Sequence, residues 1–313
     1  MNPQISIIVP LFNEEAVFPA LVERLDHVLT SIVSATEVVL VDDGSLDSTA
    51  TLIKNKCHDD ERYTGIILSR NFGHQLAVSA GMKAARCTEA AMIIDGDLQD
   101  PPELASELLA KFREGNDVVY AIRRSRKEHP LKLLAYRSYY SLMKRLSYIE
   151  IPADAGDFAM LSRRVINVIN DMPEQSRYLR GMRAWVGFRQ TGFEYERSAR
   201  ADGVPKYTLK KLFELAYNGI FNFSEIPIKL ITSLGIFSIS LCLAFLTFTL
   251  YMKVMHDAVP QGFTAQIVAL TLFSGVQLVS LGIIGEYVMR IFFEVKKRPL
   301  FIVKEKFNMA DND

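Results

Sequence analysis

Met92-Ile93-Ile94-Asp95-Gly96-Asp97-Leu98-Gln99-Asp100-Pro101-Pro102-Glu103 is the stretch of the chain that decides its fold. An apolar run, typical of a buried parallel strand, ends abruptly in oxygen-bearing side chains, and a Pro-Pro pair then opens a helix. Ligands of open α/β sheets bind just beyond the carboxyl ends of the strands. Asp95 and Asp97 project to the same side of an extended chain, and together with the amide oxygen of Gln99 they suit a hard divalent cation that holds phosphates. An acidic turn or a helix N-cap is the alternative, and the rest of the chain decides between them.

Strands and helices alternate on both sides of this stretch. Five apolar runs are predicted strands: Ile5–Pro10, Glu37–Asp42, Gly65–Ser69, Ala90–Asp95 and Asp117–Ile122. Helices are predicted over about 14–33, after the turn at 43–45, over about 75–86 and over 102–114. This alternation predicts an α/β fold, with a mostly parallel sheet, flanking helices and right-handed crossovers.

Polar side chains gather at the carboxyl ends of the first four predicted strands. They are Asn13 and Glu14, then Asp42 and Asp43, then Arg70, Asn71 and His74, and finally Asp95, Asp97 and Gln99. Four such clusters on one edge of a sheet favour a nucleotide site over a set of unrelated turns. Neither a G-x-G-x-x-G after the first strand nor a G-x-x-x-x-G-K-[ST] occurs, which disfavours a dinucleotide oxidoreductase and a P-loop NTPase.

Composition bears on the class of protein, its partners and its compartment. The 313 residues carry 36 Lys and Arg against 36 Asp and Glu, so the net charge gives no reason to expect a nucleic-acid partner. The three cysteines have no metal-ligand spacing and are predicted free thiols of a reducing compartment. The first residues do not have the pattern of a signal peptide.

Two long uncharged stretches near the end of the chain predict transmembrane helices, over about 230–252 and 263–293. Lysines and arginines precede the first stretch and follow the second, whereas the loop that connects the two stretches holds few charges. The positive-inside rule then places the large domain and both termini in the cytoplasm. We expect a catalytic domain over 1–203, a juxtamembrane segment over 204–228, the two spans within 229–294 and a basic cytoplasmic tail over 295–313.

The juxtamembrane segment has apolar residues at helical spacing beside three lysines, from Tyr207 to Phe223. A basic amphipathic helix is typical of a membrane surface, and ordinary core packing is the alternative. Glu286 and Arg290, four residues apart in the second span, are predicted to form a structural ion pair.

Four sequence motifs resemble those of a known enzyme family. They are Ile7-Ile8-Val9-Pro10-Leu11-Phe12-Asn13-Glu14, Val41-Asp42-Asp43-Gly44-Ser45, Asp95-Gly96-Asp97-Leu98-Gln99-Asp100-Pro101-Pro102-Glu103 and Gly203-Val204-Pro205-Lys206-Tyr207. The chain resembles the inverting family 2 glycosyltransferases with the GT-A fold, and most closely the polyisoprenyl-phosphate glycosyltransferases. These include dolichyl-phosphate mannose synthase and the bacterial bactoprenol glucosyltransferases. The likeness covers nearly the whole chain, including the two predicted spans.

The resemblance implies a donor site for a nucleotide diphosphate sugar. The residues implied at the nucleotide sugar are Pro10, Phe12, Glu14, Asp42, Asp43 and Asp95. Asp95, Asp97 and Gln99 would hold Mg²⁺ or Mn²⁺ against the two phosphates. Asp97 and Asp157 are the implied catalytic residues, with Asp157 either a general base or a ligand of a sugar hydroxyl.

The implied acceptor is polyprenyl phosphate at the cytoplasmic face of the inner membrane. A lipid phosphate has its second pKa near about 6, so it needs charge matching more than a base. Because guanidinium groups grip phosphate, the residues expected there are Arg123, Arg137, Arg200 and Lys206. The charge argument makes the ligand role the better hypothesis for Asp157. Trp185 stacks on sugar or lipid, or is a core or interfacial anchor.

Single-sugar transfer is expected because no Gln-x-x-Arg-Trp sequence, the mark of processive synthases, is present. UDP-glucose is the first choice of donor, and UDP-GlcNAc, UDP-galactose, an aminoarabinose donor and GDP-mannose stay open. A catalytically silent nucleotide-sugar-binding partner of a lipid flippase and a transferase to a hydroxyl acceptor are the competing hypotheses. The resemblance also suggests a homotetramer.

Overall fold

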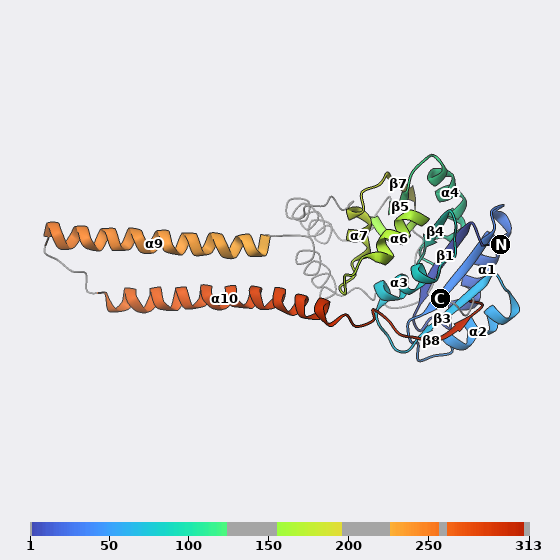
Figure 1. The fold of residues 1–313 in the computed structure, drawn as a ribbon, viewed down its shortest axis with the longest axis horizontal. Helices are drawn as coiled ribbons and strands as arrows, with labels where there is room; N and C mark the ends of the chain where they lie inside the picture. Colours follow the sequence, from blue (N-terminus) through green and yellow to red (C-terminus); the bar gives the residue numbers. More distant parts are fainter. Residues whose placement is uncertain (1, 124–154, 196–225, 257–261, 310–313) are drawn as a thin grey trace. The chain divides into compact units, whose positions relative to one another are not determined.

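An eight-stranded mixed sheet is the centre of the larger of two compact units in the computed structural model (Figure 1). The structure describes residues 2–123, 155–195, 226–256 and 262–309. The first unit holds the sheet and its helices, including the C-terminal residues from Arg298 onward, and the second holds two long apolar helices.

The strands run in the spatial order β7-β5-β6-β4-β1-β2-β3-β8. Their bounds are β1 Ile5–Leu11, β2 Thr36–Asp42, β3 Tyr63–Leu68, β4 Ala90–Ile93, β5 Val118–Arg123, β6 Ala155–Ser162, β7 Gln190–Tyr195 and β8 Val303–Phe307. The helices of this unit are α1 Phe18–Ser31, α2 Thr49–Asp59, α3 His74–Ala84, a 3₁₀ turn η1 Pro102–Leu104, α4 Ala105–Arg113, α6 Arg163–Asp171 and α7 Leu179–Trp185.

Parallel pairing dominates the part of the sheet that the sequence predicted. β1 pairs with β2 and β4, and β2 pairs with β3, all in parallel. The antiparallel strand β6 lies between β4 and β5, and β7 extends the sheet by parallel pairing with β5. The α/β class, the mostly parallel sheet and all five predicted strands are confirmed, whereas β6, β7 and β8 were not predicted.

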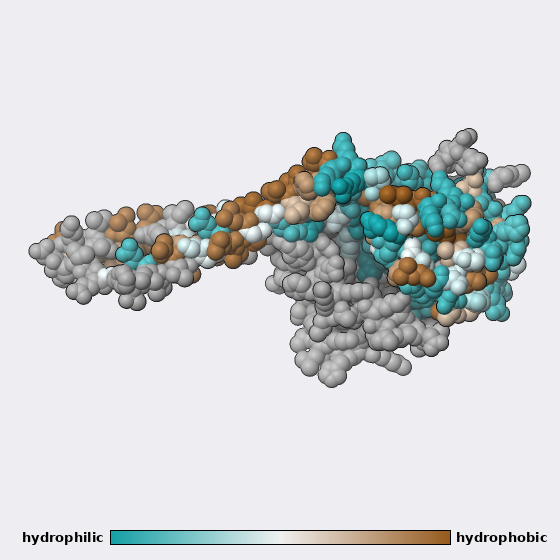
Figure 2. Space-filling model, turned by 90° about the horizontal axis from the view of Figure 1, so that it is seen from below, coloured by the Kyte–Doolittle hydropathy of each residue, from teal (hydrophilic) through white to brown (hydrophobic). Residues whose placement is uncertain are grey.

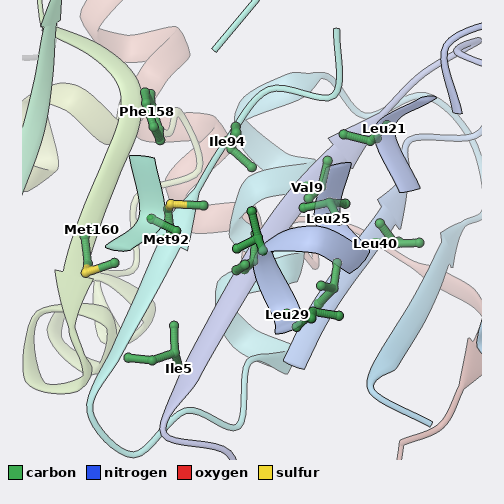
Figure 3. Packing of buried hydrophobic residues seen from close by; sticks show 14 of the residues in the cluster. Ile5, Val9, Leu21, Leu25, Leu29, Leu40, Met92, Ile94, Phe158 and Met160 are labelled. Carbon is green, nitrogen blue, oxygen red and sulfur yellow. The ribbon is translucent and has the colours of Figure 1, made fainter. Parts of the chain in front are cut away.

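Two hydrophobic layers cover the two faces of the sheet. Successive strand residues point to opposite faces, so Ile7 and Val9 pack against α1, α2 and α4 whereas Ile8 packs against α3, α6 and α7. Figure 3 shows the first layer, in which Leu21 and Leu25 of α1 lie over the strands. The buried layers fix the strand ends, where the polar clusters begin.

The C-terminal segment returns to the sheet after the apolar helices. β8 pairs antiparallel with β3 and forms the edge of the sheet. Asn308, which has a positive φ of 55°, donates from Nδ2 to the carbonyl oxygen of Tyr63 at 2.8 Å. The residues expected to form only a basic tail therefore include a strand of the catalytic unit.

The described part of the second unit holds α9, Ile226–His256, and α10, Phe263–Lys296, which contact each other. Within the described residues, Ile231–Phe248 and Leu272–Lys296 are long and apolar enough to cross a membrane. Their apolar side chains are exposed, and much of this surface is brown in Figure 2. Arg290 donates from Nε to Glu286 Oε1 at 3.0 Å, so the predicted ion pair is present. These helices indicate membrane association.

Candidate active site

The carboxyl ends of β1, β2, β3 and β4 meet at one edge of the sheet, and β6, which is antiparallel, begins at the same edge. The register pairs Ile93, the last residue of β4, with Ala159 of β6. If this register is continued by two residues, past the end of β4 and back along β6, Asp95 lies opposite Asp157. His74, at the start of α3, has its Nε2 atom 3.4 Å from Asp95 Oδ1 and 3.5 Å from Asp157 Oδ2. Residues from three distant segments therefore form one polar cluster.

The loops after β1 and β2 are joined by reciprocal bonds between side chains and backbone. Ser45 Oγ accepts from the Asn13 backbone N–H at 2.9 Å, and Asn13 Oδ1 accepts from the Leu46 N–H at 2.8 Å. Thr49 Oγ1 accepts from the Glu14 N–H at 3.0 Å. Because each loop satisfies the backbone donors of the other, the two loops form a preorganised wall at this edge.

Two glycines allow the strand ends to approach closely. A Cβ on Gly44, whose φ is +69°, would lie 2.3 Å from the backbone carbon of Arg70, so the β2 turn packs directly on the β3 loop. A Cβ on Gly96 would lie 2.4 Å from Leu11 Cδ2. The absence of side chains at these two positions brings all four loops together.

Asp42 and Asp43 are buried, with exposures of 1% and 3%. Asp42 Oδ2 accepts from the Ser45 N–H at 3.1 Å. Asp43 accepts from the N–H groups of Phe72 at 2.7 Å and Gly73 at 2.9 Å, one on each oxygen. Burial raises the pKa of both carboxyls, partly offset by these hydrogen bonds. Asp43 thus fixes the turn that precedes His74, and its predicted contact with a nucleotide stays a prediction.

The other residues predicted at the nucleotide lie on the same wall. Pro10 is buried in β1 opposite Val41, Phe12 follows the strand with 36% of its surface exposed, and Glu14 is half-buried. An exposed aromatic ring beside buried acidic groups offers a planar apolar face and hydrogen-bond acceptors in one place. This arrangement suits a base and its ribose.

Asp95, Asp97 and Gln99 follow β4, as predicted. Asp95 Oδ1 is buried and forms no hydrogen bond with the described residues. Burial raises the pKa of Asp95 to about 6, opposed by His74 and reinforced by the carboxylates of Asp157, Asp100 and Asp97. Asp97 Oδ1 accepts from the Gln99 N–H at 3.2 Å.

The chemistry of these side chains, though not yet their arrangement, suits a divalent cation. Among the described residues, no three His, Cys, Asp or Glu side chains are arranged to hold a metal ion. The oxygens of the two carboxylates and of the Gln99 amide are hard ligands, which divalent cations prefer. Asp95 Oδ1 has no hydrogen-bond donor among the described residues, and the charge nearest to it is that of His74, at 3.4 Å.

Asp157 is held by three side chains. Arg180 donates from Nε to Oδ1 at 2.8 Å and from its terminal nitrogen to Oδ2 at 3.1 Å, while Gln75 Nε2 donates to Oδ2 at 3.2 Å. Burial would raise the pKa of Asp157, but Arg180 and His74 outweigh it and hold the pKa well below the usual range. Conversely, burial disfavours the imidazolium of His74, yet Asp157 and Asp95 raise its pKa to about 9. The cluster thus contains fixed charges of both signs.

Gln75, Arg180 and Arg183 were not predicted from the sequence. Arg183, one turn after Arg180 on α7, is 4% exposed and donates to the Gly156 carbonyl oxygen at 3.2 Å. Burial lowers its pKa to about 10, so it stays charged at neutral pH. Two arginines three residues apart in Leu179–Trp185 are the sequence feature that could have indicated this pair. Trp185 is 55% exposed, which excludes the core alternative.

The predicted acceptor residues are only partly placed. Arg123 ends β5 and pairs in register with Tyr195 of β7, which puts its backbone at the ligand edge. Arg137, Arg200, Lys206 and most of the predicted amphipathic segment lie outside the described residues.

Comparison with known proteins identifies the family. The family model for glycosyl transferase family 2 matches residues 6–169, just over half of the chain. The chain belongs to glycosyl transferase family 2. It is 41% identical to the uncharacterised glycosyltransferase sll0501 of Synechocystis over 99% of this chain and 97% of that protein. It is 33% identical to the SfII prophage-derived bactoprenol glucosyl transferase of Shigella flexneri over 96% of this chain and 98% of that protein.

Solved structures of low sequence identity are similar to the chain. The mannosyltransferase PcManGT of Pyrobaculum calidifontis, in complex with GDP-Man and Mn²⁺, has a TM-score of 0.44 and 14% identity over 90% of this chain and 88% of that chain. The protein is a glycosyltransferase with a GT-A-like sheet, related to the bactoprenol glucosyl transferases.

Proposed function

We propose that the protein transfers one hexose from a nucleotide diphosphate sugar, with UDP-glucose as the first choice, to polyprenyl phosphate with inversion at the anomeric carbon. The observation that carries the proposal is the cluster of Asp95, Asp157 and His74 at the ligand edge of the sheet, in a chain that also has two exposed apolar helices. Similarity to a bactoprenol glucosyl transferase extends over those helices and supports a lipid-phosphate acceptor.

The donor lies on the wall formed by the β1 and β2 loops. Pro10, Phe12 and Glu14 contact the nucleoside with Asp42, and Asp43 holds the neighbouring turn. Asp95, Asp97 and Gln99 would hold Mg²⁺ or Mn²⁺, which when bound neutralises charge on the departing diphosphate. Side-chain oxygens of each loop accept from backbone N–H groups of the other, so little ordering remains when the donor binds.

The transfer needs no strong base. An oxygen of the lipid phosphate forms the new bond to the anomeric carbon while the bond to the nucleoside diphosphate breaks, and the electron pair leaves with the diphosphate. Because the phosphate is largely a dianion at neutral pH, no proton has to be removed. Arg123, Arg137, Arg200 and Lys206 hold the acceptor by charge. Asp157, with its lowered pKa, is better suited to accept a hydrogen bond from a sugar hydroxyl than a proton.

The reaction takes place at the cytoplasmic face of the inner membrane. The flanking lysines and arginines support cytoplasmic positions for the catalytic unit and both termini. β8 supports the same assignment for the C-terminus, because a strand of the catalytic sheet has to lie on the same side of the membrane as that sheet.

The decisive experiment is transfer in membrane vesicles that contain the protein. Vesicles are incubated with radiolabelled UDP-glucose and undecaprenyl phosphate, and the lipid extract is tested for label released by mild acid. We expect acid-labile lipid label, which is absent from vesicles with an Asp95→Ala variant. Acid-stable label would indicate a hydroxyl acceptor. No transfer from UDP-glucose, UDP-GlcNAc, UDP-galactose, an aminoarabinose donor or GDP-mannose would indicate a silent binding protein.

A further inference from the structure

Gln75 joins three elements that meet beside Asp157. It lies in the first turn of α3, directly after His74. Its Oε1 atom accepts from the Leu179 N–H at the start of α7 at 2.9 Å, and its Nε2 atom donates to Asp157 Oδ2, at the start of β6. A single side chain thus links α3, α7 and β6 at the ligand edge.

The orientation of the Gln75 amide is fixed by its partners. The first backbone N–H groups of a helix have no partner within the helix, and a backbone N–H can only donate. The Leu179 N–H therefore requires the carbonyl oxygen of Gln75, which leaves the amide nitrogen facing the carboxylate. A flipped amide would set two donors against each other and leave an acceptor against Asp157.

Arg180 fixes the carboxylate from the other side. Its two bonds to Asp157 have the parallel geometry of an Arg–carboxylate fork, which gives directional as well as electrostatic stabilisation. A carboxylate has about four lone-pair sites. Oδ2 faces Arg180, Gln75 and, at 3.5 Å, His74 Nε2. Among the described residues Oδ1 accepts only from Arg180 Nε, so one site on Oδ1 stays available to a hydroxyl group.

We propose that Gln75 and Arg180 are positioning residues of the transferase, which act through Asp157 by aiming its remaining acceptor site at a hydroxyl of the donor sugar. The inference rests on the proposed function. It assigns to α7 a part in donor-sugar orientation, separate from the basic residues predicted to hold the acceptor phosphate. Because the residues act as one unit, their substitutions should not be independent.

The test is a double-mutant cycle on the full-length enzyme in detergent or vesicles. kcat and the KM for UDP-glucose and for undecaprenyl phosphate are measured for Asp157→Asn, Arg180→Gln and the double variant. Misplacing a group by about 1 Å costs on the order of 10²-fold in rate, so we expect each single substitution to lower kcat by roughly that factor. The double variant should be no more than about threefold worse than Asp157→Asn, with the KM for the lipid unchanged.

Two further variants probe the geometry. Arg180→Lys keeps the charge but loses the fork, so its kcat should lie between those of the wild type and Arg180→Gln. Gln75→Glu keeps the acceptor for the Leu179 N–H but sets a carboxylate against Asp157, and it should lower kcat without moving the KM for the lipid.

The matched control is Arg164→Gln. Arg164 on α6 also forms a two-pronged ion pair, with Asp117, away from the ligand edge. The kcat of Arg164→Gln should stay within about twofold of wild type, because the pair lies away from the ligand edge and touches none of the residues around Asp157. Thermal unfolding of every variant is recorded to identify any that fails to fold.

Additive losses, about 10⁴-fold in the double variant, would overturn the inference by showing that Arg180 acts on a substrate directly. A rise in the KM for the lipid confined to the Arg180 variants would overturn it as well. If the wild type transfers no sugar from any donor, the proposed function fails and this inference falls with it. If the wild type is active and the losses are additive, only this inference fails.

Discussion

Asp43→Asn should destabilise the catalytic unit far more than Asp42→Asn, although the two carboxylates are neighbours and equally buried. Asp43 accepts from two backbone N–H groups, those of Phe72 and Gly73. An asparagine has one oxygen for the two donors, so its amide nitrogen would face an N–H that can only donate. The half-buried donor left unsatisfied costs roughly 1–3 kcal/mol, and loss of a charge-assisted bond brings the total to about 3 kcal/mol.

Asp42 differs because one of its partners, the Ser45 hydroxyl, can accept a hydrogen bond as well as donate one. Its carboxylate accepts from the Ser45 backbone N–H, which is shared between both oxygens, and it also faces the Gly44 N–H and the Ser45 hydroxyl. In Asp42→Asn the side-chain oxygen keeps the backbone N–H, and the hydroxyl turns to accept from the amide nitrogen. We therefore expect a loss of about 1 kcal/mol or less. A loss of 1 kcal/mol lowers Tm by about 2–4 °C in a domain of this size.

The measurement is thermal unfolding of the purified full-length protein, followed by circular dichroism, for the wild type and both variants. We expect Tm to fall by roughly 6–12 °C for Asp43→Asn and by no more than about 4 °C for Asp42→Asn. Equal shifts, or a larger shift for Asp42→Asn, would refute the hydrogen-bond argument. The comparison also bears on the site, because the turn held by Asp43 leads directly into His74.

Three further predictions follow from the site and the fold. Asp95→Ala should lower transfer by about 10²–10³-fold with an unchanged Tm, and EDTA should give the same loss, reversed by Mg²⁺ or Mn²⁺; full activity in EDTA contradicts the metal assignment. Reporters fused to either terminus should report cytoplasm and one inserted between residues 253 and 262 the far side, so ends on opposite sides would show that one span is misassigned. Arg164 lowers the pKa of Asp117 below its unfolded value of about 3.9, so the pair stabilises the fold above about pH 4 and its contribution is lost as pH falls through the lower folded pKa. Acid unfolding profiles should therefore converge for wild type and Arg164→Gln at the lowest pH, and a constant difference at every pH contradicts this account.

The five predicted strands share a property that can be recognised locally. Each is an apolar run that is buried on both faces and is followed by polar residues, as in Glu37–Asp42. Two of the three unpredicted strands, β7 and β8, lack it. β7 is largely half-buried, and β8 has the sequence Val-Lys-Glu-Lys-Phe with its charged residues exposed. Both strands lie at the ends of the sheet, where one side of the backbone has no neighbouring strand and composition is weakly constrained. Their pairing depends on the edge that β5 and β3 offer, which no local pattern contains.

The residues of the candidate site also separate into those with a local sequence signal and those without one. Asp95 and Asp97 could be predicted because parallel strands end at the ligand edge, so polar residues after an apolar run lie there. β6 reverses this rule, since an antiparallel strand enters at that edge and its first residues, not its last, face the site. Asp157 therefore precedes its apolar run, and only the resemblance to the glycosyltransferase family predicted its role. The side chains that hold it, Gln75 and Arg180, lie more than a hundred residues apart in the sequence, and both reach Asp157 because β6 lies between β4 and β5.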